Sequence, residues 1–157
     1  MANMSSATGV FEFDYETIAD KEGKKHIKNF LSLINKYLSN VEYCTWLSND
    51  IEEVLQEVDD AEEDGFSPCI DFEGTGRWAY ATNMENYFSW LSELSDSDDN
   101  KVLIALESYF SSLGRPFLTI RYVDIETGAQ LYTGGTMELT AHAVNEEEFE
   151  LNVNQID

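Results

Sequence analysis

Basic residues, cysteine, histidine and proline are all scarce in this chain of 157 residues. There are nine Lys and Arg against 31 Asp and Glu, which gives a formal net charge of −22, and the chain has two cysteines, two histidines and two prolines. Two cysteines cannot form the dense disulfide network of small secreted scaffolds, so we expect free thiols. Because phosphates and anionic lipids repel so acidic a protein, we expect neither direct nucleic-acid binding nor membrane binding.

A long apolar run is also missing. No stretch of 18 apolar residues occurs, so no segment is predicted to span a membrane. Residues Met1 to Val10 have neither the basic region nor the apolar run of a signal peptide. We therefore expect a cytoplasmic protein.

Motifs of the common catalytic sites are absent as well. The chain has no HExxH, CxxC or GxSxG pattern and no Walker loop. Carboxylate pairs of the kind that glycosidases use are abundant, but nothing in the sequence distinguishes one pair. We expect a protein that is not an enzyme and that needs no cofactor.

What the chain does have is enough apolar residues for a core. Hydrophobic residues make up 43% and aromatic residues 13% of the sequence, whereas a disordered acidic chain is poor in both. The length fits one domain. We predict a flexible N-terminal tail over residues 1–9 and a single acidic domain over residues 10–157.

Hydrophobic spacing predicts the elements of this domain. Apolar residues three and four apart predict helices over 24–39, 51–64 and 84–94, and residues 101–113 fit either a helix or a strand. Strands are predicted over 10–15, 67–72, 77–81, 117–125, 129–133, 137–144 and 149–153, with a hairpin loop at 73–76. This order favours an α+β fold in which three to four helices pack on one face of a mainly antiparallel sheet.

Acidic residues are concentrated in two stretches that contain no Lys or Arg. The first runs from Tyr37 to Gly76 and the second from Tyr122 to the end of the chain. These stretches supply our candidate partner-binding residues, which are Glu52, Glu53, Glu57, Asp59, Asp60, Glu62, Glu63, Asp64, Glu146, Glu147, Glu148 and Glu150.

The spacing of these acids suggests a charge array. Glu53, Glu57, Asp60 and Asp64 lie four, three and four residues apart, so on a helix they share one face with neighbours roughly 5–6 Å apart. Duplex DNA carries about one phosphate per 1.7 Å of axis, so carboxylates on a rigid body can imitate its charged outline. Phage and plasmid DNA-mimic inhibitors of restriction or CRISPR systems work in this way, and the chain resembles them in size, charge and aromatic-rich composition. No motif ties it to a named family.

The leading hypothesis is therefore a non-enzymatic binding protein, of the DNA-mimic type found in phage or mobile elements. Its acidic face would dock on a basic, nucleic-acid-binding protein. Three alternatives stay open. The acids could form an ordinary solvated surface, the surface could be a halophilic adaptation, or the domain could act in scaffolding or self-association, for example as a homodimer.

A calcium site is a further, weaker alternative. Residues 96–107 place oxygen ligands at positions 1, 3, 5 and 12 of an EF-hand loop, namely Asp96, Asp98, Asn100 and Glu107. Lys101 stands where that loop needs glycine for its sharp turn. A loop between two helices is the simpler interpretation of residues 95–100.

Overall fold

The computed structural model describes residues 4–37, 43–47, 51–64, 69–77, 80–93, 97–126, 131–145 and 148–156. Its strands are β1 (Met4–Phe13), β2 (Tyr43–Leu47), β3 (Cys69–Arg77), β4 (Leu118–Glu126), β5 (Leu131–Ala143) and β6 (Phe149–Ile156). Its helices are α1 (Tyr15–Ala19), α2 (Lys21–Lys36), α3 (Ile51–Asp64), α4 (Tyr80–Ser92) and α5 (Ser97–Leu113).

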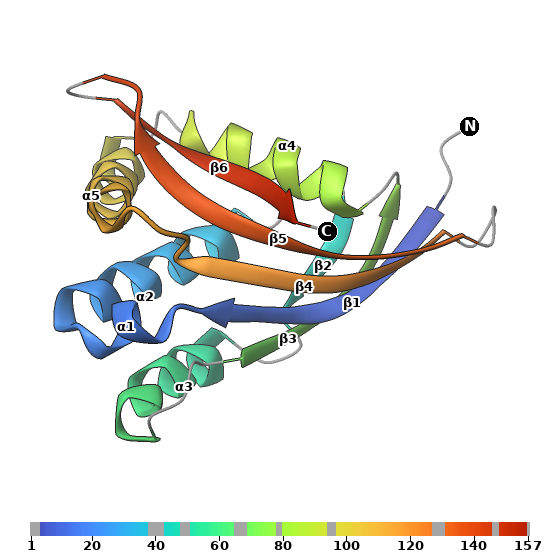
Figure 1. The fold of residues 1–157 in the computed structure, drawn as a ribbon, viewed down its shortest axis with the longest axis horizontal. Coiled ribbons are helices and arrows are strands. Elements are labelled where there is room, and N and C mark those ends of the chain that lie inside the picture. Colours follow the sequence, from blue (N-terminus) through green and yellow to red (C-terminus); the bar gives the residue numbers. More distant parts are fainter. Residues whose placement is uncertain are drawn as a thin grey trace.

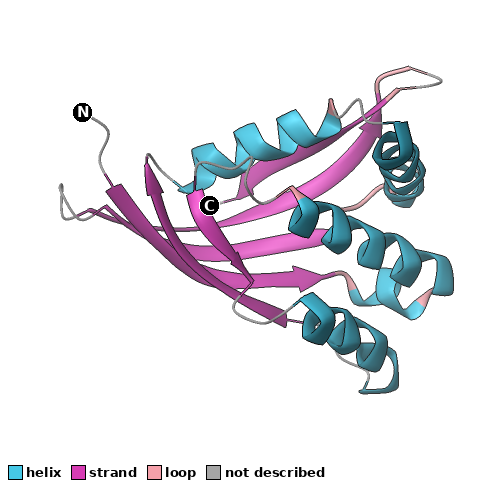
Figure 2. Ribbon diagram, turned by 180° about the vertical axis from the view of Figure 1, so that it is seen from behind, coloured by secondary structure: helices cyan, strands magenta, loops and turns pink. Residues whose placement is uncertain are grey.

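The strands form one six-stranded sheet in the order β2-β3-β1-β4-β5-β6. Every neighbouring pair is antiparallel. The helices lie on one face of this twisted sheet, as Figures 1 and 2 show from opposite sides. The predicted α+β class, with helices on one face of an antiparallel sheet, is confirmed.

The core lies between the helices and the inner face of the sheet. Along β4 the side chains of Leu118, Ile120 and Tyr122 are buried, while the residues between them are half-buried or exposed, as expected for a sheet with one solvated face. Phe110 of α5 stacks on Phe117 with ring centroids 3.9 Å apart. In the described part of the chain, none of the helices combines the length and the apolarity needed to cross a membrane.

Aspartate side chains accept N–H groups in the first turns of three helices, and each ties its helix to another part of the fold. Asp14 accepts from the Thr17 backbone N–H and from Arg115 Nε, and Asp20 accepts from the Gly23 N–H and from the Tyr109 hydroxyl. The third, Asp124 of β4, is buried and accepts the Tyr80 N–H at 2.8 Å. A carboxylate at this position satisfies a helix N–H that would otherwise have no partner.

Several predicted boundaries were wrong. Residues 4–9 belong to β1, which pairs with β3 on one side and β4 on the other, so the tail prediction does not hold there. Residues 69–77 form one strand instead of a hairpin, and residues 131–143 also form one strand. The strand at residues 43–47 was not predicted, and residues 97–113 are helical.

Two glycines lie within strands, where they make room for aromatic rings instead of turning the chain. Gly135 of β5 lies opposite Tyr122, and a Cβ there would meet that ring at 2.8–3.1 Å. Gly9 of β1 lies opposite Phe72 of β3, where a Cβ would meet the ring at 2.8 and 2.9 Å.

Strand register also places the backbone positions of the two cysteines far apart. Cys44 of β2 lies opposite Thr75 of β3, six residues along that strand from Cys69. At about 3.3 Å per residue the two positions are roughly 20 Å apart, far beyond the reach of a disulfide.

Candidate functional site

Helix α3 carries the first predicted set of acids. Glu52, Glu53 and Asp60 are exposed on it. Asp59 is half-buried and pairs with Lys28 Nζ of α2 at 3.0 Å, so this carboxylate holds α3 against α2. The backbone positions of Glu57, Glu62, Glu63 and Asp64 are helical, but their side chains lie outside the described part.

The second predicted set lies next to β6. Glu146 and Glu147 fall outside the described residues, whereas Glu148 is exposed just before the strand and Glu150 lies within it. Both of these described glutamates line a cleft.

The helical backbone of residues 97–107 contradicts the EF-hand interpretation. Residues 97–107 belong to α5, so Asp98, Asn100 and Glu107 are on a helix and cannot wrap an ion as an EF-hand loop does. Asp96 lies outside the described residues. The described residues contain no group of three or more His, Cys, Asp or Glu side chains placed to hold a metal ion.

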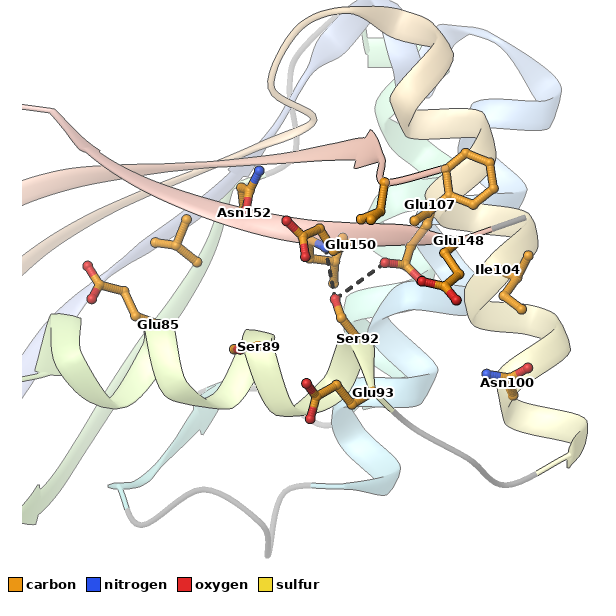
Figure 3. Close-up of a pocket in the computed structure, with 14 residues that line it drawn as sticks. Glu85, Ser89, Ser92, Glu93, Asn100, Ile104, Glu107, Glu148, Glu150 and Asn152 are labelled. Atoms are coloured by element: carbon orange, nitrogen blue, oxygen red, sulfur yellow. Dashed lines mark hydrogen bonds between the residues drawn. The ribbon is translucent and has the colours of Figure 1, made fainter. Parts of the chain in front are cut away.

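The cleft, of about 660 Å³, lies between α4, α5 and β6 (Figure 3). Five glutamates line it from different parts of the chain. Glu85 belongs to α4 and Glu93 follows it, Glu107 belongs to α5, Glu148 directly precedes β6, and Glu150 lies in β6. None of its described lining residues is Lys or Arg.

Glu107 is the buried member of this group. Its side chain is 1% exposed, and the Ser92 hydroxyl donates to its Oε2 at 3.3 Å. Ser92 itself accepts the Leu151 backbone N–H of β6 at 2.8 Å, as Figure 3 shows. The pKa of Glu107 is raised to about 8, mainly by burial; the Ser92 hydrogen bond lowers it and the negative charge of Glu150 raises it.

Two of the rim glutamates have polar neighbours within the fold. Glu150 Oε1 lies 2.9 Å from His142 Nε2 of β5, and His142 Nδ1 contacts the Asn152 amide. Glu85 Oε1 accepts from Gln155 Nε2 at 2.7 Å. Helix α4 therefore meets the edge strand β6 through side-chain hydrogen bonds, which fixes the width of the cleft.

Elsewhere, cations of the chain pair with its own acids. Lys28 pairs with Asp59, Lys36 with Asp99, and Arg121 with Glu12. A second cleft, of about 330 Å³, contains Arg115, which pairs with Asp14 at 2.9 Å and with Glu16 at 3.5 Å. The smaller cleft thus already holds a cation beside its acids, whereas the larger one does not.

Such a cleft is suited to receiving positive charge. Carboxylates form their strongest hydrogen bonds with guanidinium and ammonium groups, and the guanidinium fork matches a carboxylate in bidentate fashion. Comparison of the chain with protein-family models, with curated proteins and with solved structures gave no match. The function therefore has to be argued from these residues alone.

Sequence reasoning found only part of this cleft. Glu148 and Glu150 were among the predicted partner-binding residues, and Glu107 was considered only as a calcium ligand. Glu85 and Glu93 were missed because nothing in the sequence links them to the acids of α5 and β6, and only the fold brings them together. One available signal was the position of Glu107, since Leu103, Leu106 and Phe110 around it form the buried stripe of α5.

Proposed function

We propose that this protein is a non-enzymatic binding protein that docks through its carboxylates on a basic, nucleic-acid-binding protein. Its mode of action would be that of DNA-mimic inhibitors from phage or mobile elements. The observation that carries the proposal is the cleft with five glutamates and no Lys or Arg among its described lining residues.

The cost of this arrangement supports a role in binding. Like charges that are close together repel one another and destabilise the compact state, and solubility alone is served by a net charge of about 2–8 in magnitude. The chain carries −22. A basic partner would relieve the repulsion, because its cations would neutralise the carboxylates of the cleft, where the described lining residues include no Lys or Arg.

Helix α3 adds a second acidic surface to the cleft. Glu52 and Glu53 are exposed in its first turn, and Asp60 is exposed about two turns further on. A DNA-binding protein gains binding free energy when phosphates displace counterions from its basic surface. Rigidly held carboxylates on this chain would displace them in the same way. This shared electrostatic gain is the physical basis of the DNA-mimic proposal.

The test uses two variants with matched charge. One replaces Glu85, Glu93 and Glu148 of the cleft with Gln, and the other replaces Glu52 and Glu53 with Gln and Asp60 with Asn on α3. Each removes three negative charges. The immobilised wild-type protein and both variants are incubated with bacterial lysate, and bound proteins are eluted with duplex DNA and identified by mass spectrometry.

We expect the wild-type protein to retain one or a few nucleic-acid-binding proteins that duplex DNA releases, and the cleft variant to lose them. The α3 variant reports how far the second surface contributes. Retention that is equal for all three proteins, or that duplex DNA does not affect, would contradict docking by charge mimicry.

Self-association is a second candidate, and the outer face of the sheet favours it. By strand register, Val123, Tyr132 and Ile156 lie on the face opposite the helices, and their side chains are 45%, 75% and 40% exposed. Sedimentation at 0.1 and 0.5 M NaCl separates the two candidates. Salt screens the repulsion between copies and so promotes apolar self-association, whereas it weakens docking on a basic protein.

A further inference from the structure

The outer face of the sheet carries far less charge than the molecule as a whole. None of the described helices lies on this face (Figures 1 and 2), and directly paired residues form rows across it. From β3 to β6, one row consists of Asp71, Val10, Arg121, Thr136 and Ile156. The next two rows, through Val123 and Ile125, contain one charged residue, Glu73. With one cation and two acids, the three rows carry a net charge of −1, against −22 for the chain.

These three rows also have the extent of a small protein interface. Their apolar side chains include Val123, Tyr132 and Ile156, which are 45%, 75% and 40% exposed. Each row crosses five strands, which span about 19 Å, and the rows together extend about 14 Å along the strands. With the side chains at its edges, the area covers roughly 500 Å² of each copy. Contact between two copies would bury on the order of 1,000 Å², the lower range for a specific interface.

We propose that these rows are the interface of a symmetric dimer, in which two copies pack sheet against sheet with the two-fold axis along β1. The inference rests on self-association, the second candidate of the proposed function, and adds the residues that hold the copies together. A basic partner gains little from a face of such low charge, whereas a second copy meets less repulsion here than at the acidic surfaces. The helices of both copies stay on the outside of this dimer.

The axis follows from the positions of Arg121 and Asp71. They lie in one row, on β4 and β3, with β1 between them. A two-fold rotation about β1 exchanges these positions, so each Arg121 lies opposite the Asp71 of the other copy. The Arg121 side chain is 59% exposed, and Asp71 is exposed as well. Facing sheets pack about 10 Å apart, a gap that one long and one short side chain can bridge.

Residues of β1 meet their own counterparts across the same axis. Thr8 and Val10 are uncharged, and Glu12 is the next residue of β1 on this face. Repulsion between the two copies of Glu12 is offset by Arg121, whose Nε lies 3.3 Å from Glu12 Oε2 within each chain. A guanidinium has five N–H donors, so Arg121 can bind Glu12 of its own chain and Asp71 of the other copy together.

The experiment measures the dimer dissociation constant of the full chain by sedimentation equilibrium at 0.3 M NaCl and pH 7.5. The wild-type protein is compared with Arg121→Asp, with Asp71→Arg and with the double variant, which exchanges the two charges and keeps the net charge. Glu12→Gln is the control, because it removes the partner of Arg121 within the chain and keeps the pair between copies. Thermal unfolding of each variant verifies that it is folded.

We expect the wild-type protein and Glu12→Gln to dimerise, and each single reversal to weaken the dimer about tenfold or more, because like charges then face each other at both symmetry-related positions. The double variant should restore the wild-type dissociation constant. Asp71→Arg is the decisive single change, because it makes the chain less negative and would strengthen the dimer if only the overall repulsion mattered.

A double variant as weak as the single variants would overturn this arrangement of the two copies while leaving self-association intact. A wild-type protein that is monomeric at every concentration would overturn both. Docking on a basic protein is tested separately by the cleft and α3 variants, which leave Arg121 and Asp71 unchanged.

Discussion

At the scale of single residues, burial makes the ionisation of Glu107 unfavourable. Its pKa is raised from 4.5 to about 8, so the unfolded state releases a proton between these pH values that the folded state keeps. The contribution of Glu107 therefore lowers the free energy of unfolding as pH rises from about 4.5 to about 8, and it is constant below and above that window.

Replacing Glu107 with Gln removes this dependence and keeps the shape of the side chain. We expect the variant to be more stable than the wild-type protein by about 1–3 kcal/mol at pH 9 and nearly equal to it at pH 4.5. Urea unfolding at both pH values measures the difference. The Glu93→Gln variant, on the exposed rim, is the control, and a Glu107→Gln gain that is equal at both pH values would show that ionisation is not the cause.

His26 gives the opposite pH dependence. Burial lowers its pKa below 6.5, the positive charge of Lys25 lowers it further, and Glu22 acts in the opposite direction. Its Nδ1 is buried and has no hydrogen-bond partner. Because the unfolded state takes up the proton first, the stabilising contribution of the neutral ring is present above pH 6.5 and is lost as pH falls through the lowered pKa.

The His26→Phe variant keeps the ring that packs on Tyr109, whose centroid is 4.8 Å away, and removes the titration. We expect it to gain about 1 kcal/mol at pH 7.5, because no buried nitrogen is left without a partner, and to gain more at pH 5. Thermal unfolding at the two pH values provides the measurement. If the stability gain of the variant became smaller toward pH 5, protonation of His26 would stabilise the folded state, contrary to this prediction.

At the scale of elements, one carboxylate positions the helix that forms a wall of the cleft. Asp124 of β4 accepts the N–H of Tyr80, the first residue of α4, at 2.8 Å in a buried setting. Replacing it with Ala leaves that N–H without its acceptor, so we expect a loss of about 1–3 kcal/mol. Asp124→Asn keeps a side-chain oxygen and should lose less.

Hydrogen exchange locates this effect. Amides of the first turn of α4 should exchange faster in the Asp124→Ala variant. Amides of α3, which packs on α1 and α2, should exchange no faster than the change in global stability requires. Equal acceleration in α3 and α4 would show that Asp124 supports the whole fold and not one helix end.

Sequence pattern located the helices better than the strands, for a physical reason. The stripe of α3 is set by residues within one segment, so its bounds, 51–64, were predicted directly. The role of a glycine in a strand depends on its cross-strand neighbour. The predicted strands 129–133 and 137–144 leave out Gly135, because nothing in the sequence shows that it lies opposite the Tyr122 ring.

The candidate site was hidden for the same reason. Acids that are dense in the sequence, as in α3, were found at once, but the cleft joins glutamates that are up to 65 residues apart, from Glu85 to Glu150. Their proximity depends on α4 packing beside the edge strand β6, and only the folded topology determines that contact.

At the scale of the whole molecule, the net charge of −22 opposes folding and favours binding to a basic partner. Repulsion among the carboxylates opposes the compact state, and added salt screens it, because the Debye length falls from about 30 Å at 0.01 M to about 10 Å at 0.1 M. Attraction between the acidic surface and a basic partner is screened by the same ions.

We therefore expect the melting temperature of the free protein to rise between 0.01 and 0.3 M NaCl, while the affinity for the DNA-released partner falls over the same range. Choline chloride in place of NaCl controls for specific binding of sodium. The triple cleft variant, with Glu85, Glu93 and Glu148 replaced by Gln, should show a smaller salt dependence of its melting temperature because it carries three fewer charges. A melting temperature that falls with salt would mean that internal ion pairs such as Lys28–Asp59 outweigh the repulsion, and the excess charge would then need no partner to balance it.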